Sequence, residues 1–529
     1  MINKKYTAFI IGLISFIVVF INLFPNWYAW KNTPEGYVFT GQASWFDPWD
    51  INNYVSAIRW GQDRGLLIEN VYDSVENKPI FYYPLYTVGG RIFQNSNPFV
   101  VFYLLSIFTS VILITFLVLV LKKFFKRPIV LILTTLAIAL GGGLGFLVFP
   151  TYESLDTHMT SITLFSSFQR AHEGFALTAY LLALFGFYLS VTTGSKKWRL
   201  LTVIGLVVTL LFYPYHFLSF LLISAVFYFL SFRKISKKDF SFLISVIFFG
   251  LIVTGFMFYN LFLSSSFVGI TGQSLSKPKL TPFLLGYGIL LIPYLYQLFV
   301  TRRTQFFKSF LLIWISVGII LCLIPVGFSR FFLRGVYVPL VIVAVFTIKE
   351  FCQKYFSKEH FKVFVVFLNY LLVFLSITSC FIFYHRLRES YKQNDWYYMT
   401  QFEHEALIKM EKSYSNPSSI LSSYYMGNLI PAHTKHRVYL GHLIQTPNAD
   451  KRLVRLANFY TQEMSDNEAK EFLQEAQIDL IFYRKEEKEL LQLINQDQTD
   501  LSNNLELNYS FLEEVFSNDE VSIYQNRWH

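Results

Sequence analysis

Two carboxylates follow the first long hydrophobic segment of the chain, in the aromatic stretch GQASWFDPWDINNY. They are Asp47 and Asp50, and Tyr54 lies four residues after Asp50. A carboxylate can act as a general base toward a substrate hydroxyl or bind a metal ion. Apolar residues at 51, 54, 55 and 58 predict a helix over 51–65, and Pro48 disfavours helix at Asp47. Asp50 is therefore expected at a helix start, where capping and chemistry are alternative but compatible roles.

Asp156 and His158 form a second candidate pair, since a single residue separates them. Alternate side chains of an extended backbone point the same way. Both residues could therefore bind one divalent cation, Mg²⁺ or Mn²⁺, together with Asp47 or Asp50. The alternative is a solvated surface loop, and the two interpretations differ in whether these residues converge in space.

Arg330 and Arg334 are the strongest candidates for binding a phosphate. They lie four residues apart in the short segment GFSRFFLRG, so a helical turn would present both guanidinium groups on one face. Two such groups can bind one phosphate. The alternative is that both side chains only extend to lipid headgroups at the membrane surface. His216, at a predicted helix junction, is a further candidate for a headgroup or pocket contact, or a local hydrogen-bonding residue.

The chain that must position these residues is too hydrophobic and too long for one soluble domain. Of its 529 residues, 53% are hydrophobic and 15% charged, and the mean hydropathy is +0.41. Such values are typical of a polytopic membrane protein. A helix needs about 20 apolar residues to cross a bilayer. Eleven segments are candidate spans: 6–27, 98–121, 128–149, 172–192, 200–214, 215–232, 240–263, 281–300, 309–327, 335–349 and 363–385.

Basic residues in alternate connections predict how these segments are oriented. The residues are Lys122, Lys123, Lys126 and Arg127; Lys196, Lys197 and Arg199; Arg233, Lys234, Lys237 and Lys238; Arg302, Arg303 and Lys308; and Lys349, Lys354, Lys358 and Lys362. Lys4 and Lys5 precede the first segment, so the positive-inside rule places the N-terminus in the cytoplasm. The net charge of +10 therefore implies no nucleic-acid partner, because the cytoplasmic loops account for much of it.

An odd number of spans divides the chain into a membrane domain over 1–385 and an extracytoplasmic tail over 386–529. The loops 28–97 and 150–171 then lie on the same outer face of the cell membrane. Alternating apolar runs predict strands at 418–422, 437–440, 478–483 and 521–524, and helical spacing occurs at 450–463 and 466–477. Ser465 is a candidate N-cap of the second of these helices, and Glu468 three residues later has the spacing of a capping box. The tail is therefore predicted to be an α/β domain.

Together these features resemble the GT-C superfamily of integral-membrane glycosyltransferases. That superfamily includes the protein O-mannosyltransferases, the aminoarabinose transferases of lipid A and the oligosaccharyltransferases. The resemblance rests on Asp50 with Tyr54 in the first outer loop, the segment KPIFYYPLY before the second span, the odd number of spans and the outer α/β tail. It covers the whole architecture, although its specific motif is short.

The resemblance implies an inverting transferase that moves a sugar from a polyprenyl phosphate or pyrophosphate carrier to an extracytoplasmic glycan, lipid or protein. By position, Asp50 matches the Asp of the Asp-x-x-x-Tyr pattern, with Asp47 as its nearest competitor. Tyr54 and Tyr83 would contact substrate. Two departures limit the match, since Ile51 stands where O-mannosyltransferases have Glu, and the oligosaccharyltransferase sequence WWDYG is absent.

The same resemblance bears on metal and phosphate binding. Asp156-Thr-His158 is similar to the Asp-x-His metal motif of some archaeal oligosaccharyltransferases. A metal ion, Arg330 or Arg334 would stabilise the departing phosphate.

Two other function classes fit the sequence. A lipid-linked sugar flippase or transporter would hold ionisable groups at mid-membrane on broken helices, and GGGLG at 141–145 could break a helix. A non-catalytic membrane assembly subunit would bind carrier lipid without turnover. The ionisable residues instead cluster at the predicted outer ends of the spans, which favours the transferase.

Overall fold

The computed structural model describes residues 2–152, 154–159, 162–231, 237–267, 279–302, 305–356, 359–484 and 509–526. The chain divides into two compact units. The first comprises Met1–Pro25, Tyr103–Tyr259 and Ser274–Leu387, and the second comprises Asn26–Phe102, Asn260–Gln273 and Arg388–His529. The last junction lies close to the predicted boundary at 385–386. The second unit, however, also includes the predicted first outer loop, so that loop groups with the tail.

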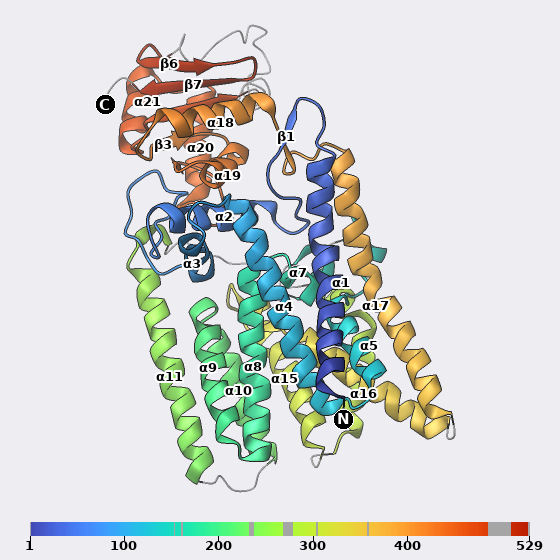
Figure 1. Cartoon of the computed structure of the whole chain (residues 1–529). Helices are drawn as coiled ribbons and strands as arrows, with labels where there is room; N and C mark the ends of the chain where they lie inside the picture. Colours follow the sequence, from blue (N-terminus) through green and yellow to red (C-terminus); the bar gives the residue numbers. More distant parts are fainter. Residues whose placement is uncertain are drawn as a thin grey trace. The chain divides into compact units, whose positions relative to one another are not determined.

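Helices make up the first unit (Figure 1). The long ones are α1 (Lys4–Lys31), α4 (Pro98–Phe124), α5 (Pro128–Ala139), α8 (Ala171–Thr193), α9 (Lys196–Phe212), α10 (His216–Ser231), α11 (Lys237–Phe262), α13 (Leu280–Tyr287) with α14 (Leu291–Val300), α15 (Phe306–Cys322), α16 (Tyr337–Tyr355) and α17 (His360–Tyr391). Short turns complete it: η1 (Gly145–Leu147), α6 (Leu155–His158), α7 (Leu164–Ser167), η2 (Gly288–Leu290) and η3 (Ser329–Leu333). Their apolar side chains form one continuous core.

The prediction of a polytopic helical membrane protein is confirmed. A helix lies at each of the eleven predicted segments, and seven helices among the described residues are long and apolar enough to cross a membrane. The helices α5, α9, α10 and α15 have only 12 to 17 residues. At 1.5 Å per residue, these four are shorter than the roughly 30 Å of a bilayer core.

The predicted helix over 128–149 was too long, because α5 ends at Ala139. A glycine run follows, and it lets two segments of backbone approach each other closely. A Cβ atom on Gly143 would lie only 2.2 Å from the carbonyl oxygen of Leu285. The Gly143 backbone N–H also donates to Asp156, at 2.7 Å. The glycines thus end the helix and bring the chain toward Asp156.

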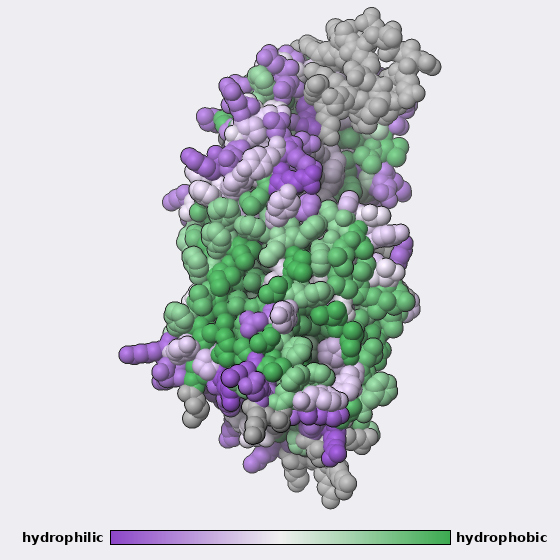
Figure 2. All heavy atoms as spheres, turned by 90° about the vertical axis from the view of Figure 1, so that its right-hand side faces the viewer, coloured by the Kyte–Doolittle hydropathy of each residue, from purple (hydrophilic) through white to green (hydrophobic). Residues whose placement is uncertain are grey.

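Surface hydropathy fits helices that cross a membrane, and the cytoplasmic position of the N-terminus stays a prediction. On the face drawn in Figure 2, hydrophobic side chains cover the helices of the first unit, and hydrophilic side chains gather at the end where the N-terminus lies. Lys122 at that end donates a hydrogen bond to Thr7, at 2.7 Å. Of the basic residues in the predicted cytoplasmic loops, Arg233, Lys234, Arg303 and Lys358 lie outside the described residues.

The second unit combines two sheets with helices. Its elements are β1 (Tyr37–Phe39), α2 (Pro48–Asp63), α3 (Pro84–Ile92), β2 (Tyr398–Thr400), α18 (Gln401–Ser413), β3 (Ser419–Leu421), α19 (Tyr424–His433), β4 (Arg437–Val438), α20 (Ala449–Tyr460), α21 (Asp466–Glu475), β5 (Leu480–Arg484), β6 (Leu512–Ser517) and β7 (Val521–Asn526). β1 pairs antiparallel with β2. The larger sheet has the order β4-β3-β5-β7-β6.

The α/β prediction for the tail is confirmed by this larger sheet. β3 runs parallel to β4 and β5, whereas β7 is antiparallel to β5 and β6. All four predicted strands and both predicted helices are present, and Ser465 and Glu468 form the expected capping box. The sheet and helices bury a common core that includes Leu421, Phe459 and Phe472. The strands β1, β2 and β6 and the helices α18 and α19 were not predicted.

Candidate functional site

Asp50 lies in the first turn of α2, so the expectation of a carboxylate at a helix start is confirmed in outline. The helix begins at Pro48, and its N-cap residue is Asp47, with φ 39° and ψ 72°. Asp50 is therefore not the N-cap, and the capping interpretation of this residue was wrong. The Asp50 backbone N–H donates to the carbonyl oxygen of Asp47 at 3.0 Å, which closes the first turn. A negative charge in this turn is stabilised by the helix dipole.

The Asp50 carboxylate contacts a histidine from the tail. His442 Nε2 lies 2.5 Å from Asp50 Oδ1, and the Tyr54 hydroxyl lies 3.4 Å from Oδ2. The first contact is a short, charge-assisted hydrogen bond, and the second is long. The His442 side chain is 2% exposed and the Asp50 side chain 18%. The histidine is thus held inside the unit, while the carboxylate keeps accessible surface.

A tight turn after β4 positions His442. The backbone N–H groups of Gln445 and Thr446 donate to the His442 carbonyl oxygen at 2.9 and 2.8 Å, and Gly441 N–H donates to the Thr446 hydroxyl at 3.2 Å. Gly441 must lack a side chain, because a Cβ atom there would lie 2.5 Å from the Gly427 carbonyl oxygen. Sequence reasoning missed His442. Its place at the carboxyl end of a predicted strand was a usable signal, since ligands often bind at such ends.

Tyrosine rings lie beside Asp50. The ring of Tyr54 stacks on that of Tyr86, with centroids 4.9 Å apart, and meets Tyr83 edge-on at 5.3 Å. Asn53 Nδ2 and Gln445 Nε2 both donate to the Tyr83 hydroxyl oxygen at 3.0 Å. The structure therefore brings together Asp50, Tyr54 and Tyr83, three of the predicted site residues.

The electrostatics of this cluster follow from burial and from the carboxylates. Burial, with added effects of neighbouring tyrosines and the charge of Asp50, raises the pKa of Tyr83 well above its usual value. Burial and the charges of Asp50 and Asp47 raise the pKa of Tyr424 to about 12. Both hydroxyls therefore stay protonated at neutral pH and can donate hydrogen bonds to a bound oxygen.

Ion pairs hold the first loop and the tail together within the second unit. Arg452 pairs with Asp73 at 2.6 Å, and Arg437 pairs with Glu69 at 2.5 Å. Asn70 Nδ2 donates to the Gln445 carbonyl oxygen at 2.7 Å. These contacts involve buried or half-buried groups, so solvent screens them less than ordinary surface pairs. They fix the tail residues of the site relative to α2.

Asp156, in the first unit, does not have the predicted extended geometry. Residues 155–158 form the single helical turn α6, so Asp156 and His158 do not alternate along a strand. Asp156 Oδ2 accepts hydrogen bonds from Gly143 N at 2.7 Å, Gly145 N at 3.3 Å and the Thr378 hydroxyl at 3.0 Å, and Ser154 donates to Oδ1. Burial raises the pKa of Asp156, and these hydrogen bonds act against the increase.

The arrangement around Asp156 does not fit a metal ligand. The side chain is fully buried, and four donors already occupy its two oxygens. His158 Nδ1 accepts a hydrogen bond from the Ser154 N–H at 3.2 Å. Across the described parts of the chain, no group of three or more His, Cys, Asp or Glu residues could hold a metal ion. The participation of a divalent cation stays a prediction.

Arg334 is buried with an anionic partner. It lies 3.6 Å from Glu173, which also pairs with Arg170 at 3.7 Å, and it donates to the Tyr215 hydroxyl at 2.7 Å. Its guanidinium carbon lies 3.6 Å from the Tyr213 ring centre. Glu173 thus offsets part of the positive charge that was predicted to hold a phosphate.

Arg330 and His216 have different surroundings. Arg330 belongs to η3 and lies over the Phe331 ring at 5.2 Å, whereas Arg334 follows that turn. His216 is fully buried and stacks on Tyr180 with centroids 4.4 Å apart. In this conformation it presents no exposed surface to a lipid headgroup. The roles predicted for these residues in phosphate and substrate binding stay predictions.

Solved structures resemble this chain over nearly its whole length. The oligosaccharyltransferase of Archaeoglobus fulgidus in its apo form aligns with a TM-score of 0.57 and 14% identity, covering 99% of this chain and 75% of that one. ArnT from Cupriavidus metallidurans bound to undecaprenyl phosphate aligns with a TM-score of 0.54 and 10% identity, covering 99% and 98%. The chain has a GT-C-like fold. No family model matches this sequence, and no curated protein sequence matches it.

The GT-C-like fold agrees with the resemblance expected from the sequence. One further solved structure contains a metal ion. The Archaeoglobus fulgidus oligosaccharyltransferase in complex with Zn and sulfate aligns with a TM-score of 0.52 and 14% identity, covering 98% of this chain and 73% of that one. At such identities the likeness concerns the fold, so the GT-C-like fold by itself assigns no reaction to this chain.

Proposed function

We propose that this protein is a membrane glycosyltransferase that moves a sugar from a polyprenyl-phosphate carrier to an extracytoplasmic acceptor, with inversion at the anomeric carbon. The observation that carries the proposal is the Asp50 carboxylate, 18% exposed and held by His442 in the first turn of α2. The GT-C-like fold supports the reaction class, because the neighbours are an oligosaccharyltransferase and an ArnT bound to undecaprenyl phosphate.

Asp50 would act on the acceptor. The acceptor hydroxyl oxygen attacks the anomeric carbon, the bond from that carbon to the carrier phosphate breaks, and the phosphate leaves with the electron pair. Asp50 would accept the hydroxyl proton or hydrogen-bond to that hydroxyl as it attacks. The helix dipole favours the ionised form that this role needs.

His442 would position Asp50 rather than touch the substrate. It donates from Nε2 to Asp50 Oδ1, and its Nδ1 is a buried atom that finds no hydrogen-bond partner among the described residues. One carboxylate oxygen is therefore oriented by the protein, and the carboxylate keeps accessible surface for an acceptor. Tyr54 and Tyr83 would form an aromatic surface beside the sugar.

Two residues of the first unit complete the proposal. Arg330 and Arg334 would stabilise the negative charge that develops on the carrier phosphate. The two differ in their environment, because Arg334 is already paired with Glu173. We therefore expect Arg330→Gln and Arg334→Gln to differ, and a loss of donor affinity confined to one variant would identify the phosphate ligand.

The deciding experiment measures sugar transfer by the purified full-length protein from a panel of radiolabelled polyprenyl-phosphate sugars. The unaltered chain is compared with Asp50→Asn and with Asp47→Asn, which removes the same charge three residues away. Transfer that is lost in Asp50→Asn and retained in Asp47→Asn supports the proposal. The opposite pattern would assign the role to Asp47. EDTA, followed by added Mg²⁺ or Mn²⁺, tests for a metal requirement.

A flippase or a non-catalytic assembly subunit gives different results in the same samples. If carrier lipid binds but no sugar is transferred to any acceptor, a translocation assay in proteoliposomes separates these two classes. A flippase would move the labelled carrier across the bilayer, whereas an assembly subunit would only retain it. Either result would overturn the transferase proposal.

A further inference from the structure

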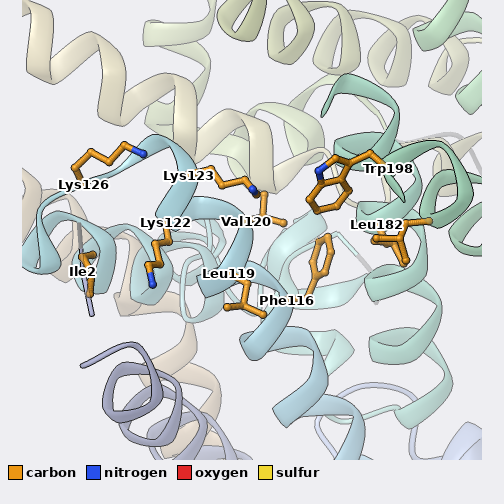
Figure 3. Close-up of a pocket in the computed structure, with 10 residues that line it drawn as sticks. Ile2, Phe116, Leu119, Val120, Lys122, Lys123, Lys126, Leu182 and Trp198 are labelled. Atoms are coloured by element: carbon orange, nitrogen blue, oxygen red, sulfur yellow. The ribbon is translucent and has the colours of Figure 1, made fainter. Parts of the chain in front are cut away.

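A cavity of about 560 Å³ lies in the first unit, beside the start of the chain, whereas Asp50 belongs to the second unit. Figure 3 shows the side chains around it. The lining residues are Ile2, Phe116, Leu119, Val120, Lys122, Lys123, Lys126, Leu182, Trp198 and Leu201. They come from the start of the chain, from α4, α8 and α9, and, for Lys126, from the segment between α4 and α5. The distribution of basic residues predicts that this end of the helices is cytoplasmic.

The polar side of the cavity carries only positive charge. Lys122, Lys123 and Lys126 line it, and none of the ten lining residues is acidic. Lys122 donates to the Thr7 hydroxyl at 2.7 Å, and the Lys123 ammonium lies 5.2 Å from the Trp198 ring centre. Within the described ranges, none of these three lysines forms an ion pair. An anion entering the cavity would therefore meet three cationic groups without a competing carboxylate.

The rest of the lining is apolar. Phe116, Leu119 and Leu182 face the cavity, and Leu119 is also 49% exposed on the outside of the helices. Trp198 stands opposite Lys123, where an amphipathic ring is favoured at a membrane interface. A ligand that suits this lining carries a negative headgroup at one end and hydrocarbon at the other.

We infer that this cavity binds an anionic phospholipid, with the headgroup phosphate among the three lysines and the first part of an acyl chain along Phe116, Leu119 and Leu182. Basic pockets between membrane helices suit such headgroups. A small free anion would leave the apolar wall unused, and a zwitterionic lipid would bring its own cation to the lysines. The inference does not depend on the proposed sugar transfer.

The test uses the full chain in nanodiscs of phosphatidylcholine with about 20% phosphatidylglycerol, and native mass spectrometry counts the lipids that remain bound after release. We expect one retained phosphatidylglycerol, and about tenfold weaker retention in Lys122→Gln/Lys123→Gln/Lys126→Gln, because each lysine contributes to headgroup attraction. The matched control is Lys349→Gln/Lys354→Gln/Lys362→Gln, which removes three exposed basic residues from another predicted cytoplasmic segment. That control should retain the lipid.

A second variant separates a bound lipid from general charge attraction. Leu182→Trp keeps the charge and fills part of the apolar space, so it should also lose the retained phosphatidylglycerol. Equal retention in Leu182→Trp, in both lysine triples or for phosphatidylcholine would overturn the inference. Displacement by inorganic phosphate alone would show a phosphate site rather than a lipid site. Unchanged elution and melting temperature exclude misfolding of the variants.

Discussion

Asp50 of the second unit and Asp156 of the first unit differ in burial and in the number of hydrogen-bond donors around the carboxylate. Asp156 is fully buried, and two backbone N–H groups and two hydroxyls donate to it. Asp50 is 18% exposed, with His442 at 2.5 Å and a distant Tyr54 hydroxyl. A carboxylate saturated by donors holds local structure, whereas one with accessible surface can bind a substrate.

Arginines extend the comparison. Arg334 of the first unit lies buried between Glu173 and two tyrosines, while arginines of the second unit, such as Arg452 and Arg437, pair with carboxylates of the first loop. In both units the paired charges order the backbone near a candidate residue. Removing one partner would leave a buried charge uncompensated, which costs more than losing a surface pair.

The largest expected effect is on catalysis by the second unit. We expect Asp50→Asn to reduce the rate of sugar transfer by about 10²- to 10⁴-fold, because an amide cannot accept the acceptor proton. The fold should persist, since Asn still accepts a hydrogen bond from His442. Initial rates under saturating donor, with the melting temperature as a control, measure this. An unchanged rate in Asp50→Asn would contradict the catalytic role that distinguishes Asp50 from Asp156.

Asp156→Asn should reduce the stability of the fold, whereas Asp50→Asn should reduce the rate of transfer and leave the fold intact. An Asn side chain replaces one acceptor oxygen with a donor, which opposes at least one of the N–H or O–H groups that face Asp156. We expect the free energy of unfolding to fall by about 3 kcal/mol. Hydrogen exchange at residues 155–158 and the melting temperature report the loss. Ser154→Ala, which removes one donor, should cost less. A stable, inactive Asp156→Asn protein would contradict the structural role.

The two units should also respond to pH with opposite sign. Burial, reinforced by the charge of Arg59, lowers the pKa of His433 to about 3 from a usual value of 6.5. Between these values the unfolded state binds more protons, so the free energy of unfolding decreases as pH falls from 6.5 toward 3. The raised pKa of Asp156 means that its folded form binds more protons, so its contribution is lost as pH rises above its usual value of 3.8.

Hydrogen exchange corrected for intrinsic rates can check both signs in one sample. Protection around 424–433 should fall from pH 7 to pH 4, and protection around 155–158 should not follow the same trend. His433→Asn should flatten the first profile and leave the second unchanged. If protection of both segments changed with pH in the same direction, the predicted opposite pH responses of the two units would be wrong.

The smallest expected effect concerns the positioning of Asp50. We expect His442→Ala to reduce kcat by about tenfold, corresponding to the loss of one charge-assisted hydrogen bond, with little change in KM for the donor. His442→Gln should recover much of this rate, because its amide can donate to Asp50. A merely structural role would lower stability in both variants and would show no such recovery.

Much of the architecture could be predicted from composition and periodicity. The helices at the eleven predicted segments, seven of them long and apolar enough to cross a membrane, follow from continuous apolar runs. The α/β tail follows from runs such as 478–483 and the capping box at Ser465. These signals are local, because hydrophobic burial and capping act on residues close in sequence. The short strands β1 and β2 escaped prediction, since each has three residues and depends on the other for pairing.

The site was only half determined by sequence. Asp47, Asp50 and Tyr54 could be recognised from residue type and spacing, because the first turn of a helix and the Asp-x-x-x-Tyr pattern are local. The tertiary structure alone decided that His442, 392 residues further along, contacts Asp50, and that Asp156 is enclosed by donors from Gly143 and Thr378. No local pattern records such contacts, because they arise when distant backbone segments close around a charge and satisfy it.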